Sequence, residues 1–214
     1  AVFLNRRPLD QLTMSVAYPA LPVKLIGFLP GVTTPGGVTH QAIDDVAVMR
    51  AIPNMTVLST GDATEVESVL DVIHSTPGPV YVRMLRGEMP RLFPTDEPFE
   101  LGKARDLSPG TGQADVLVLT EGICTEEALR ALPIVRDRGV RVRHLHISTL
   151  KPFNDPVVLE ALAANHAGVI TMENHLRNGG LGSAVAEVLA ENGSGVPLTR
   201  LGLDDTYAHG ASQK

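Results

Sequence analysis

Strand-length apolar runs alternate with helical patterns along this 214-residue chain, and no other feature limits its fold as strongly. The runs that predict strands cover residues 23–28, 56–60, 80–84, 115–120, 140–147, 168–173 and 198–203. Helical patterns lie between most of them, at residues 41–51, 62–74, 125–138, 156–165 and 181–192. The residues at several helix ends suit their positions: N-caps are expected at Asp62, Thr125 and Asp155, and a C-terminal stop at Gly139. Parallel strands need long crossover connections, usually helices, so this order predicts an α/β protein whose parallel sheets are covered by helices.

A segment rich in proline and glycine, residues 94–112, interrupts the alternation and predicts an inter-domain linker. It separates a first block, residues 1–93, from a second, residues 113–214. The second block has four expected strands and three expected helices, which suits a complete α/β domain. The first opens on a helix-like segment, residues 4–17, and has only three expected strands. So small a parallel sheet leaves much of its core open, and we expect material outside this chain to complete it.

Composition excludes several classes of partner. The net charge is −6 and there is no dense run of Lys or Arg, so we expect no nucleic acid and no anionic membrane as a partner. The apolar runs are too short to span a bilayer, and residues 1–8 do not resemble a signal peptide. Cys124 is the only cysteine, which excludes a disulfide framework and favours a cytoplasmic location.

The first candidate site is a loop rich in glycine and proline, residues 27–40, between an expected strand and an expected helix. Such a loop lies at the carboxyl end of a parallel strand, where α/β proteins bind ligands. Its last residue, His40, is expected at a helix start, where the helix dipole favours a neutral imidazole that can donate a hydrogen bond. The local pattern equally fits a glycine-rich turn with a surface histidine, and alone it slightly favours that interpretation.

Two further motifs have both a binding and a structural interpretation. Arg83 and Arg86 end an apolar strand, where a guanidinium suits phosphate or carboxylate, although a surface ion pair is commoner. Gly179, Gly180 and Gly182 precede an apolar helix and could cradle an anion, but close packing of helix and strand is the favoured interpretation. The other histidines lack metal-ligand spacing and are expected to be structural or surface residues: His74, His144, His146, His166 and His209.

Four stretches, taken together, resemble the transketolase family. They are residues 36–55 (GGVTHQAIDDVAVMRAIPNM), 78–83 (GPVYVR), 151–154 (KPFN) and 173–182 (ENHLRNGGLG). They occur in the family's order over almost the whole chain, and the pattern most resembles the carboxyl-terminal subunit of a split thiamine-diphosphate-dependent transketolase. The resemblance implies that residues 1–93 are the rear part of a pyrimidine-binding domain. It makes residues 113–214 a transketolase-type C-terminal α/β domain.

The resemblance also implies a cofactor and a partner. Family members bind thiamine diphosphate between subunits, with Mg²⁺ or Ca²⁺ on the diphosphate. The Gly-Asp-Gly motif for that metal is absent from this sequence, so no metal ligand is expected here. The glutamate that activates the aminopyrimidine normally lies upstream of Ala1. We therefore expect an N-terminal diphosphate-binding transketolase subunit as partner, in a hetero-oligomer of two plus two chains that acts on a small-molecule substrate.

Three residues of this chain match functional positions of the family, and a fourth is a further candidate for the site. Phe3 matches an aromatic residue that packs on the aminopyrimidine, with simple core packing as the alternative. His40 matches the catalytic histidine that faces the reactive thiazolium carbon and binds substrate oxygens. Arg86 matches an arginine that holds the substrate phosphate, and Arg7 is a further candidate to face the substrate cleft.

The chain departs from the family at two places in the loop. Gly36 stands where the family usually has an acidic residue that binds a substrate hydroxyl. Phe28 and Leu29 stand where a histidine or arginine is expected. A site without these polar groups gains little from a phosphorylated, hydroxylated sugar. We therefore expect a donor or acceptor that differs from the standard sugar phosphates, or a loss of activity.

The sequence thus predicts a transferase, active only with its partner, that moves a two-carbon ketol or acyl unit in carbohydrate metabolism or a specialised biosynthetic pathway. Two alternatives remain open at this point. One is a β-subunit of a 2-oxo acid dehydrogenase or decarboxylase, which shares the architecture. The other is a non-catalytic structural subunit, in which the loop has lost its function.

Overall fold

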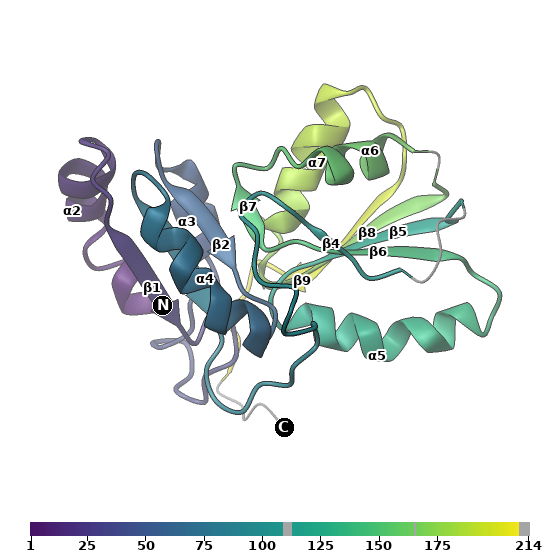
Figure 1. Ribbon diagram of the computed structural model, residues 1–214, viewed down its shortest axis with the longest axis horizontal. Coiled ribbons are helices and arrows are strands. Elements are labelled where there is room, and N and C mark those ends of the chain that lie inside the picture. Colours follow the sequence, from purple (N-terminus) through teal and green to yellow (C-terminus); the bar gives the residue numbers. More distant parts are fainter. Residues whose placement is uncertain (109–112, 165, 210–214) are drawn as a thin grey trace.

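The computed structural model describes residues 1–108, 113–164 and 166–209. It contains two sheets with helices on both faces, which confirms the expected α/β class (Figure 1). The end of the expected linker (109–112), the last residue of one expected helix (165) and the end of the second block (210–214) lie outside the described residues.

The first sheet has the strand order β1-β3-β2-β7. Its members are β1 (Lys24–Phe28), β2 (Thr56–Ser59), β3 (Val80–Met84) and β7 (Thr149–Lys151). β1 and β2 each pair in parallel with β3, as the alternation predicts. β7, which was not among the expected strands, pairs antiparallel with β2. The second half of the chain therefore contributes an edge strand to the sheet of the first half.

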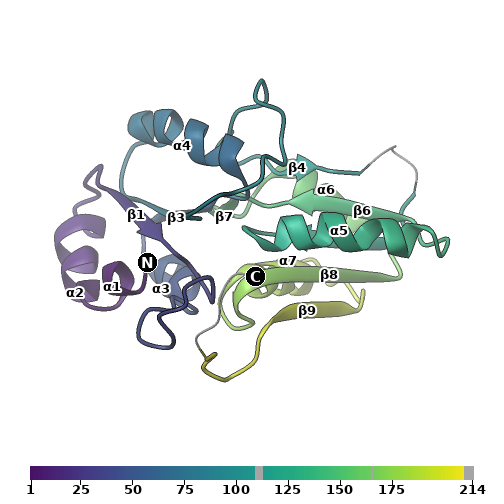
Figure 2. The ribbon, with the colours of Figure 1, turned by 90° about the horizontal axis from the view of Figure 1, so that it is seen from below.

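Helices cover both faces of this sheet. Figure 2 shows α4 (Ala63–Ser75) on one side and α3 (Asp45–Ala51) on the other. α4 begins as its sequence predicts, because the Asp62 carboxylate accepts a hydrogen bond from the backbone N–H of Glu65 at 2.9 Å. The Glu65 carboxylate in turn accepts from the backbone N–H of Gly61 at 2.9 Å. This exchange satisfies two donors that a helix start would otherwise leave free.

The helix-like segment expected at residues 4–17 forms three short pieces. They are α1 (Val2–Asn5), α2 (Leu9–Gln11) and a π-helical turn at Leu12–Ala17. Pro8 precedes α2. Because proline has no backbone N–H to donate, it interrupts the helical hydrogen bonding at this point.

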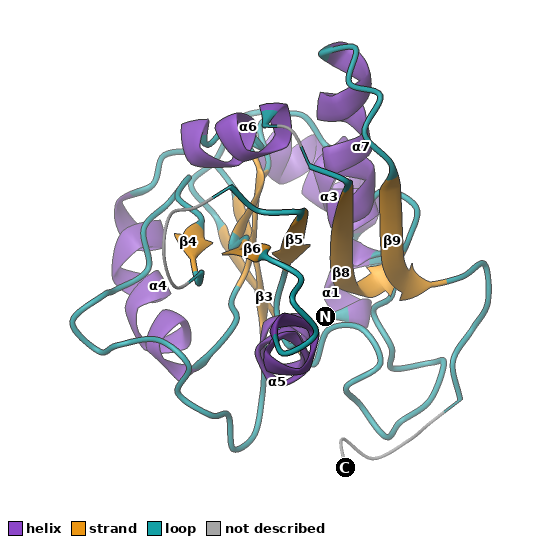
Figure 3. Ribbon diagram, turned by 90° about the vertical axis from the view of Figure 1, so that its right-hand side faces the viewer, coloured by secondary structure: helices purple, strands orange, loops and turns teal. Residues whose placement is uncertain are grey.

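The second sheet has the order β4-β6-β5-β8-β9. Its members are β4 (Arg105–Asp106), β5 (Val116–Thr120), β6 (Val142–His146), β8 (Gly168–Leu176) and β9 (Leu198–Leu203). β5, β6, β8 and β9 pair in parallel, whereas β4 pairs antiparallel with β6 from within the segment expected as a linker. Figure 3 shows α5 (Cys124–Arg136) on one side of this sheet, and α6 (Pro156–Ala163) and α7 (Leu181–Glu191) on the other.

The helix ends of the second half follow local chemistry with one exception. The Asp155 carboxylate caps α6 by accepting from the backbone N–H of Val157 at 2.9 Å. Gly139, with a φ of 83°, follows α5 as the sequence predicts. The expectation that Thr125 caps α5 is wrong, since the helix begins one residue earlier and the Thr125 hydroxyl contacts Thr120 inside the domain.

One hydrophobic core spans both sheets. Buried side chains of the first half, such as Met49, Met55 and Tyr81, belong to the same cluster as Leu119 and Leu145 of the second. Burying apolar surface is the main favourable contribution to folding, so this shared core holds the halves together. None of the helices in the described residues is both long and apolar enough to cross a membrane.

Candidate functional site

The loop that ends in His40 leaves the carboxyl end of β1, as expected, but His40 does not lie at a helix start. α3 begins only at Asp45, and His40 lies in a turn where its backbone N–H donates to Gly37 O at 2.9 Å. The helix-dipole argument for a neutral imidazole therefore does not apply. The ring is oriented instead by a contact of 2.9 Å between its Nδ1 and the Thr39 hydroxyl.

Three of the four predicted site residues form one exposed group, which we call the His40 cluster: Phe3, Arg7 and His40. The rings of Phe3 and His40 lie 5.1 Å apart, centroid to centroid, at an interplanar angle of 77°. The Arg7 guanidinium carbon lies 4.3 Å from the centroid of the Phe3 ring, a cation–π distance. Phe3 remains 43% exposed, so its ring is not core packing. An aromatic face, an imidazole and a cation thus lie together at the surface.

Arg86, the fourth predicted residue, is not among the contacts of the His40 cluster. It follows β3, and the last residue of that strand, Met84, pairs in register with Phe28 at the end of β1. Arg86 is exposed, and it follows β3 at the end of the sheet where the carboxyl ends of β1 and β3 lie side by side. Within the described residues, no hydrogen bond or ion pair joins it to Phe3, Arg7 or His40.

Three loop residues stand where the resemblance predicts polar side chains, and the structure shows the setting of each. A Cβ atom at Gly36 would lie 2.8 Å from His40 Cγ, so no side chain fits there while His40 holds its place. Leu29 has a φ of 55°, in the left-handed region that costs a residue other than glycine on the order of 1–3 kcal/mol. Phe28 is 49% exposed. The loop therefore begins on an exposed apolar side chain and a strained residue.

A buried ion network lies behind the loop, and we call it the Arg83 network: Arg83, Asp45 and Glu121. Arg83 Nε lies 2.8 Å from Asp45 Oδ2, and Arg83 Nη1 lies 3.1 Å from Glu121 Oε1. All three side chains are at most 1% exposed. The sequence favoured a surface ion pair for Arg83; the structure shows a buried one instead, in which the arginine joins a carboxylate of each half.

The charges of this network support one another. Burial alone would raise the pKa of Asp45, but the positive charge of Arg83 and its hydrogen bonds lower that pKa overall. Burial would likewise lower the pKa of Arg83, but Asp45 and Glu121 raise it. Burial, followed by the Asp45 charge, raises the pKa of Tyr81, whose hydroxyl donates to Asp45 at 2.6 Å. The ion pair of Arg83 with Asp45 therefore persists across the ordinary pH range.

A second buried polar group joins the halves through Glu65 and His146. His146 Nε2 lies 3.0 Å from one Glu65 carboxylate oxygen, and the Ser148 hydroxyl donates to the other at 2.7 Å. Burial alone would raise the pKa of Glu65, but the charge of His146 and these hydrogen bonds lower it to about 2. His144 is buried beside this group, and burial, together with the nearby His146, lowers its pKa to about 4. Both histidines are thus structural, as the sequence suggested.

The glycine-rich start of α7 binds an anion of the chain itself. The Glu173 carboxylate accepts from the backbone N–H groups of Leu181 at 2.8 Å and Gly182 at 2.9 Å. A Cβ atom at Gly180 would lie 1.9 Å from the same carboxylate. Burial is the main reason that the pKa of Glu173 rises to about 7. The anion cradle and the close packing are therefore the same feature. The Glu173 carboxylate occupies the cradle, and the glycines allow it to approach closely.

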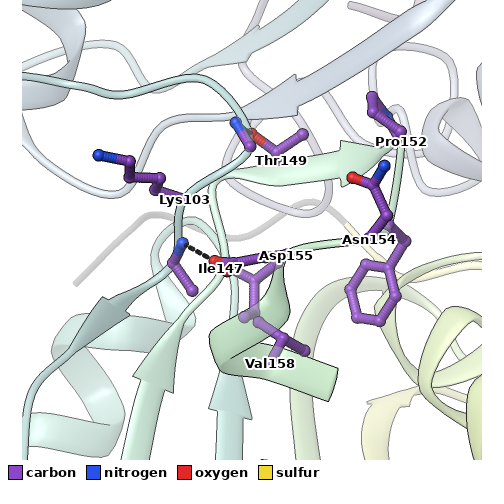
Figure 4. Close-up of a pocket in the computed structure, with 10 residues that line it drawn as sticks. Lys103, Ile147, Thr149, Pro152, Asn154, Asp155 and Val158 are labelled. Atoms are coloured by element: carbon purple, nitrogen blue, oxygen red, sulfur yellow. Dashed lines mark hydrogen bonds between the residues drawn. The ribbon is translucent and has the colours of Figure 1, made fainter. Parts of the chain in front are cut away.

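Figure 4 shows a shallow hollow in another part of the molecule. It is lined by residues 102–104 and 152–155, together with Ile147, Thr149 and Val158. The Asp155 carboxylate accepts from the backbone N–H of Ala104 at 2.6 Å across it, drawn as a dashed line. No His40-cluster residue lines it. Elsewhere in the chain, the described residues hold no group of three or more His, Cys, Asp or Glu that could bind a metal ion.

Residues 1–91 match the family model of the transketolase pyrimidine-binding domain, and residues 102–214 match that of the transketolase C-terminal domain. The chain belongs to the transketolase family. The two matches confirm the resemblance drawn from the four sequence stretches. They also confirm that a pyrimidine-binding domain precedes a transketolase C-terminal domain.

Individual transketolase-family proteins are similar over nearly the whole chain. The 6-deoxy-6-sulfo-D-fructose transketolase subunit of Clostridium sp. (strain MSTE9) is 41% identical over 96% of this chain and 62% of its own length. An apulose-4-phosphate transketolase subunit of Phocaeicola vulgatus is 34% identical over 100% of this chain and 68% of its own length. The chain therefore spans about three fifths to two thirds of the length of these relatives.

A solved transketolase has the same fold. It is described as a split-gene transketolase in an inactive β4 tetramer. It superposes with a TM-score of 0.85 at 36% identity, covering 96% of this chain and 65% of that one.

Sequence reasoning missed the structural role of Arg83. The residue was interpreted only as a charged group at the end of a strand. The signal that could have identified it is an arginine inside an apolar strand, residues 80–84, every residue of which is buried.

Proposed function

We propose that this chain is a subunit of a thiamine-diphosphate-dependent, transketolase-like transferase that moves a two-carbon ketol or acyl unit. The observation that carries the proposal is the His40 cluster, which lies in the transketolase pyrimidine-binding domain at the carboxyl end of β1. Its imidazole, aromatic ring and guanidinium are exposed and adjacent. Such a group suits a cofactor and a polar substrate better than it suits packing.

A partner chain is part of the proposal. We propose an N-terminal diphosphate-binding subunit, in a two-plus-two hetero-oligomer, that supplies the activating glutamate and holds Mg²⁺ or Ca²⁺. Two observations support this. One is that two relatives are themselves named as transketolase subunits. In addition, neither amide atom of the buried Asn5 side chain has a hydrogen-bond partner in the described residues, which favours completion of the region by another component.

The residues present fit the pyrimidine end of the cofactor. Phe3 offers an exposed apolar ring face for a planar heterocycle, and the His40 ring stands nearly perpendicular to it. When bound, thiamine diphosphate supplies a nucleophilic carbon that attacks the carbonyl carbon of a ketose or 2-oxo acid. Phe3 would hold the pyrimidine ring, whereas the diphosphate and its metal would be held by the partner.

His40 has the geometry of a hydrogen-bond donor to substrate oxygen. Its Nδ1 contacts the Thr39 hydroxyl at 2.9 Å, which orients the ring and leaves Nε2 for the substrate. A donor aimed at an oxygen that gains negative charge stabilises the transition state. Arg86 would bind a phosphate at the end of β3 through its planar guanidinium. Arg7, stacked on Phe3, would place a second positive charge beside the substrate.

We further propose that substrate choice differs from that of enzymes acting on standard sugar phosphates. Phe28 is 49% exposed at the start of the loop, and Gly36 has no side chain with which to bind a hydroxyl. A site of this kind favours a less polar donor or acceptor. Such chemistry suits a cytoplasmic enzyme of carbohydrate metabolism or specialised biosynthesis, and the single cysteine, Cys124, is consistent with that location.

The test is reconstitution of the full-length chain with a partner subunit that carries a Gly-Asp-Gly motif. We expect two-carbon transfer only when both chains, thiamine diphosphate and Mg²⁺ are present. His40→Ala should lower kcat by about a hundredfold, the effect typical of losing one oxyanion donor. His74→Ala, an exposed histidine on α4, serves as the matched control and should keep full activity.

Each alternative predicts a different result of the same experiment. Unchanged activity in His40→Ala would favour a non-catalytic subunit. Transfer to a lipoyl group, together with co-purification of an acyltransferase, would favour a β-subunit of a 2-oxo acid dehydrogenase. Efficient transfer between ordinary pentose phosphates would overturn the proposed change in substrate choice.

A further inference from the structure

One side chain of the C-terminal domain reaches the loop that carries His40. Asn174, in β8, accepts a hydrogen bond at its Oδ1 from the backbone N–H of Val32 at 3.0 Å. Its Nδ2 donates to the backbone oxygen of Pro30 at 3.2 Å. Both ends of one amide are thus used on a single turn of the loop, from 142 and 144 residues away in the sequence.

The turn that Asn174 binds is the neck of the loop. Pro30 and Gly31 form isolated β-bridges with Ala42, and the backbone N–H of Gly31 donates to Ala42 O at 2.7 Å. Ala42 is fully buried and lies only two residues after His40. Fixing residues 30–32 therefore also fixes the position of Ala42, and with it the backbone two residues from His40.

Asn174 is itself held by the Arg83 network. Its backbone N–H donates to Glu121 Oε1 at 3.0 Å, and its backbone oxygen accepts from Arg83 Nη2 at 3.0 Å. These bonds use the main chain and leave the amide side chain free for the loop. The side chain thus projects from a backbone clamped between two buried, oppositely charged groups.

The Asn174 side chain fits closely against the loop, and it holds a strained part of the loop backbone in place. A Cβ atom at Gly31 would lie 2.2 Å from the Asn174 side chain, and Gly31 has a φ of 61°. Leu29, two residues earlier, also adopts the left-handed conformation. Such a conformation persists only when the surrounding structure imposes it. The two hydrogen bonds of Asn174 are a restraint of this kind.

We propose that Asn174 is a positioning residue through which the C-terminal domain sets the place of His40. The proposal rests on the function proposed for His40, because it assigns Asn174 no contact with substrate or cofactor. It gives the C-terminal domain a part in the reaction beyond packing against the pyrimidine-binding domain.

The first test measures the loop without activity. Hydrogen exchange of the full-length chain, followed by mass spectrometry, should show at least tenfold faster exchange in residues 29–42 for Asn174→Ala. Asn174→Asp, which is nearly isosteric, removes the Nδ2 donor and should have the same direction of effect even if Asn174→Ala folds poorly. Asn192→Ala, an exposed asparagine that follows α7, is the control and should leave the loop unchanged. Equal exchange in the loop for all variants would overturn the proposal.

The second test asks whether Asn174 acts through His40. In the reconstituted enzyme, Asn174→Ala should lower kcat about tenfold, and less than threefold when His40→Ala is already present. Equal losses in both backgrounds would overturn the proposal, because a purely structural residue acts independently of His40. If His40→Ala alone leaves activity intact, the proposed function of His40 fails, while the exchange experiment still decides whether Asn174 holds the loop.

Discussion

The Arg83 network and the His40 cluster each contain an arginine and lie near the same end of the first sheet, but only the first is complete. Arg83, Asp45 and Glu121 are buried and partnered within the chain, whereas Phe3 and His40 are exposed and contact each other, Arg7 and Thr39 at the surface. Buried charges must find partners inside the fold, because removing them from water is costly. Exposed groups are solvated by water, so they need no partner within the chain and remain accessible to a ligand. Substitutions in the first region should therefore change stability, and those in the second activity.

The largest effect is expected for Arg83→Met. It removes the shared counter-charge and leaves Asp45 and Glu121 buried together without it. Breaking a buried ion pair in this way costs about 3–5 kcal/mol of unfolding free energy. Urea denaturation at pH 7 measures the change. Arg130→Met, which breaks the exposed pair with Glu127, should shift the midpoint only slightly; equal shifts in both variants would contradict the contrast.

The next largest effect is expected from acid, which should destabilise the buried group formed by Glu65, His146 and Ser148. The pKa of Glu65 is about 2 in the folded chain, below its unfolded value of about 4.5. Its contribution is therefore complete above about pH 4.5 and is lost as the pH falls towards 2, on the order of 3 kcal/mol in all. Glu65→Gln should remove this contribution at pH 7 and flatten the dependence of stability on pH in that range. Urea titrations from pH 2 to 7 measure it, and Glu67→Gln should change the slope much less, because water screens the exposed pair of Glu67 with Arg91.

In the exposed region, Gly36→Asp should lower kcat of the reconstituted enzyme roughly ten- to a hundredfold, as expected when a catalytic group is misplaced. The new Cβ atom would lie 2.8 Å from His40 Cγ and force the imidazole away. Steady-state kinetics and urea denaturation together should show lost activity with little lost stability. Gly195→Asp is the control, because nothing lies within 4 Å of its Cβ position. Better use of hydroxylated sugar phosphates by Gly36→Asp would show that the site has room for the acid, against the steric argument.

The smallest effect is expected for Arg86→Ala. If Arg86 binds the substrate phosphate equally in the ground and transition states, KM for a phosphorylated substrate should rise about tenfold while kcat stays within about twofold. The assay compares phosphorylated substrates with unphosphorylated analogues. Arg138→Ala, an exposed arginine after α5, should leave both constants unchanged. An equal rise in KM for the unphosphorylated analogue would show that Arg86 does not bind the phosphate.

Local patterns predicted much of the fold, whereas the candidate site residues came from the family resemblance. The alternation of strands and helices, the cap at Asp62 and the stop at Gly139 depend on residues close in sequence, and the structure confirms them. The short strand β7 was missed, because Thr149–Lys151 has no strand pattern of its own and forms by pairing with β2. His40 was placed at a helix start for a similar reason, since nothing local shows that α3 begins only at Asp45.

By itself, the sequence determined the family, the order of the two domains and the loop that ends in His40, because periodicity and motifs are properties of neighbouring residues. Only the tertiary structure decided that Phe3 and Arg7 lie beside His40, that Arg83 joins carboxylates of both halves, and that Asn174 binds the neck of the loop. The physical reason is desolvation. A charge or an amide is compelled to find a partner only when packing removes it from water, and that packing joins residues from 38 to 144 positions apart in the sequence.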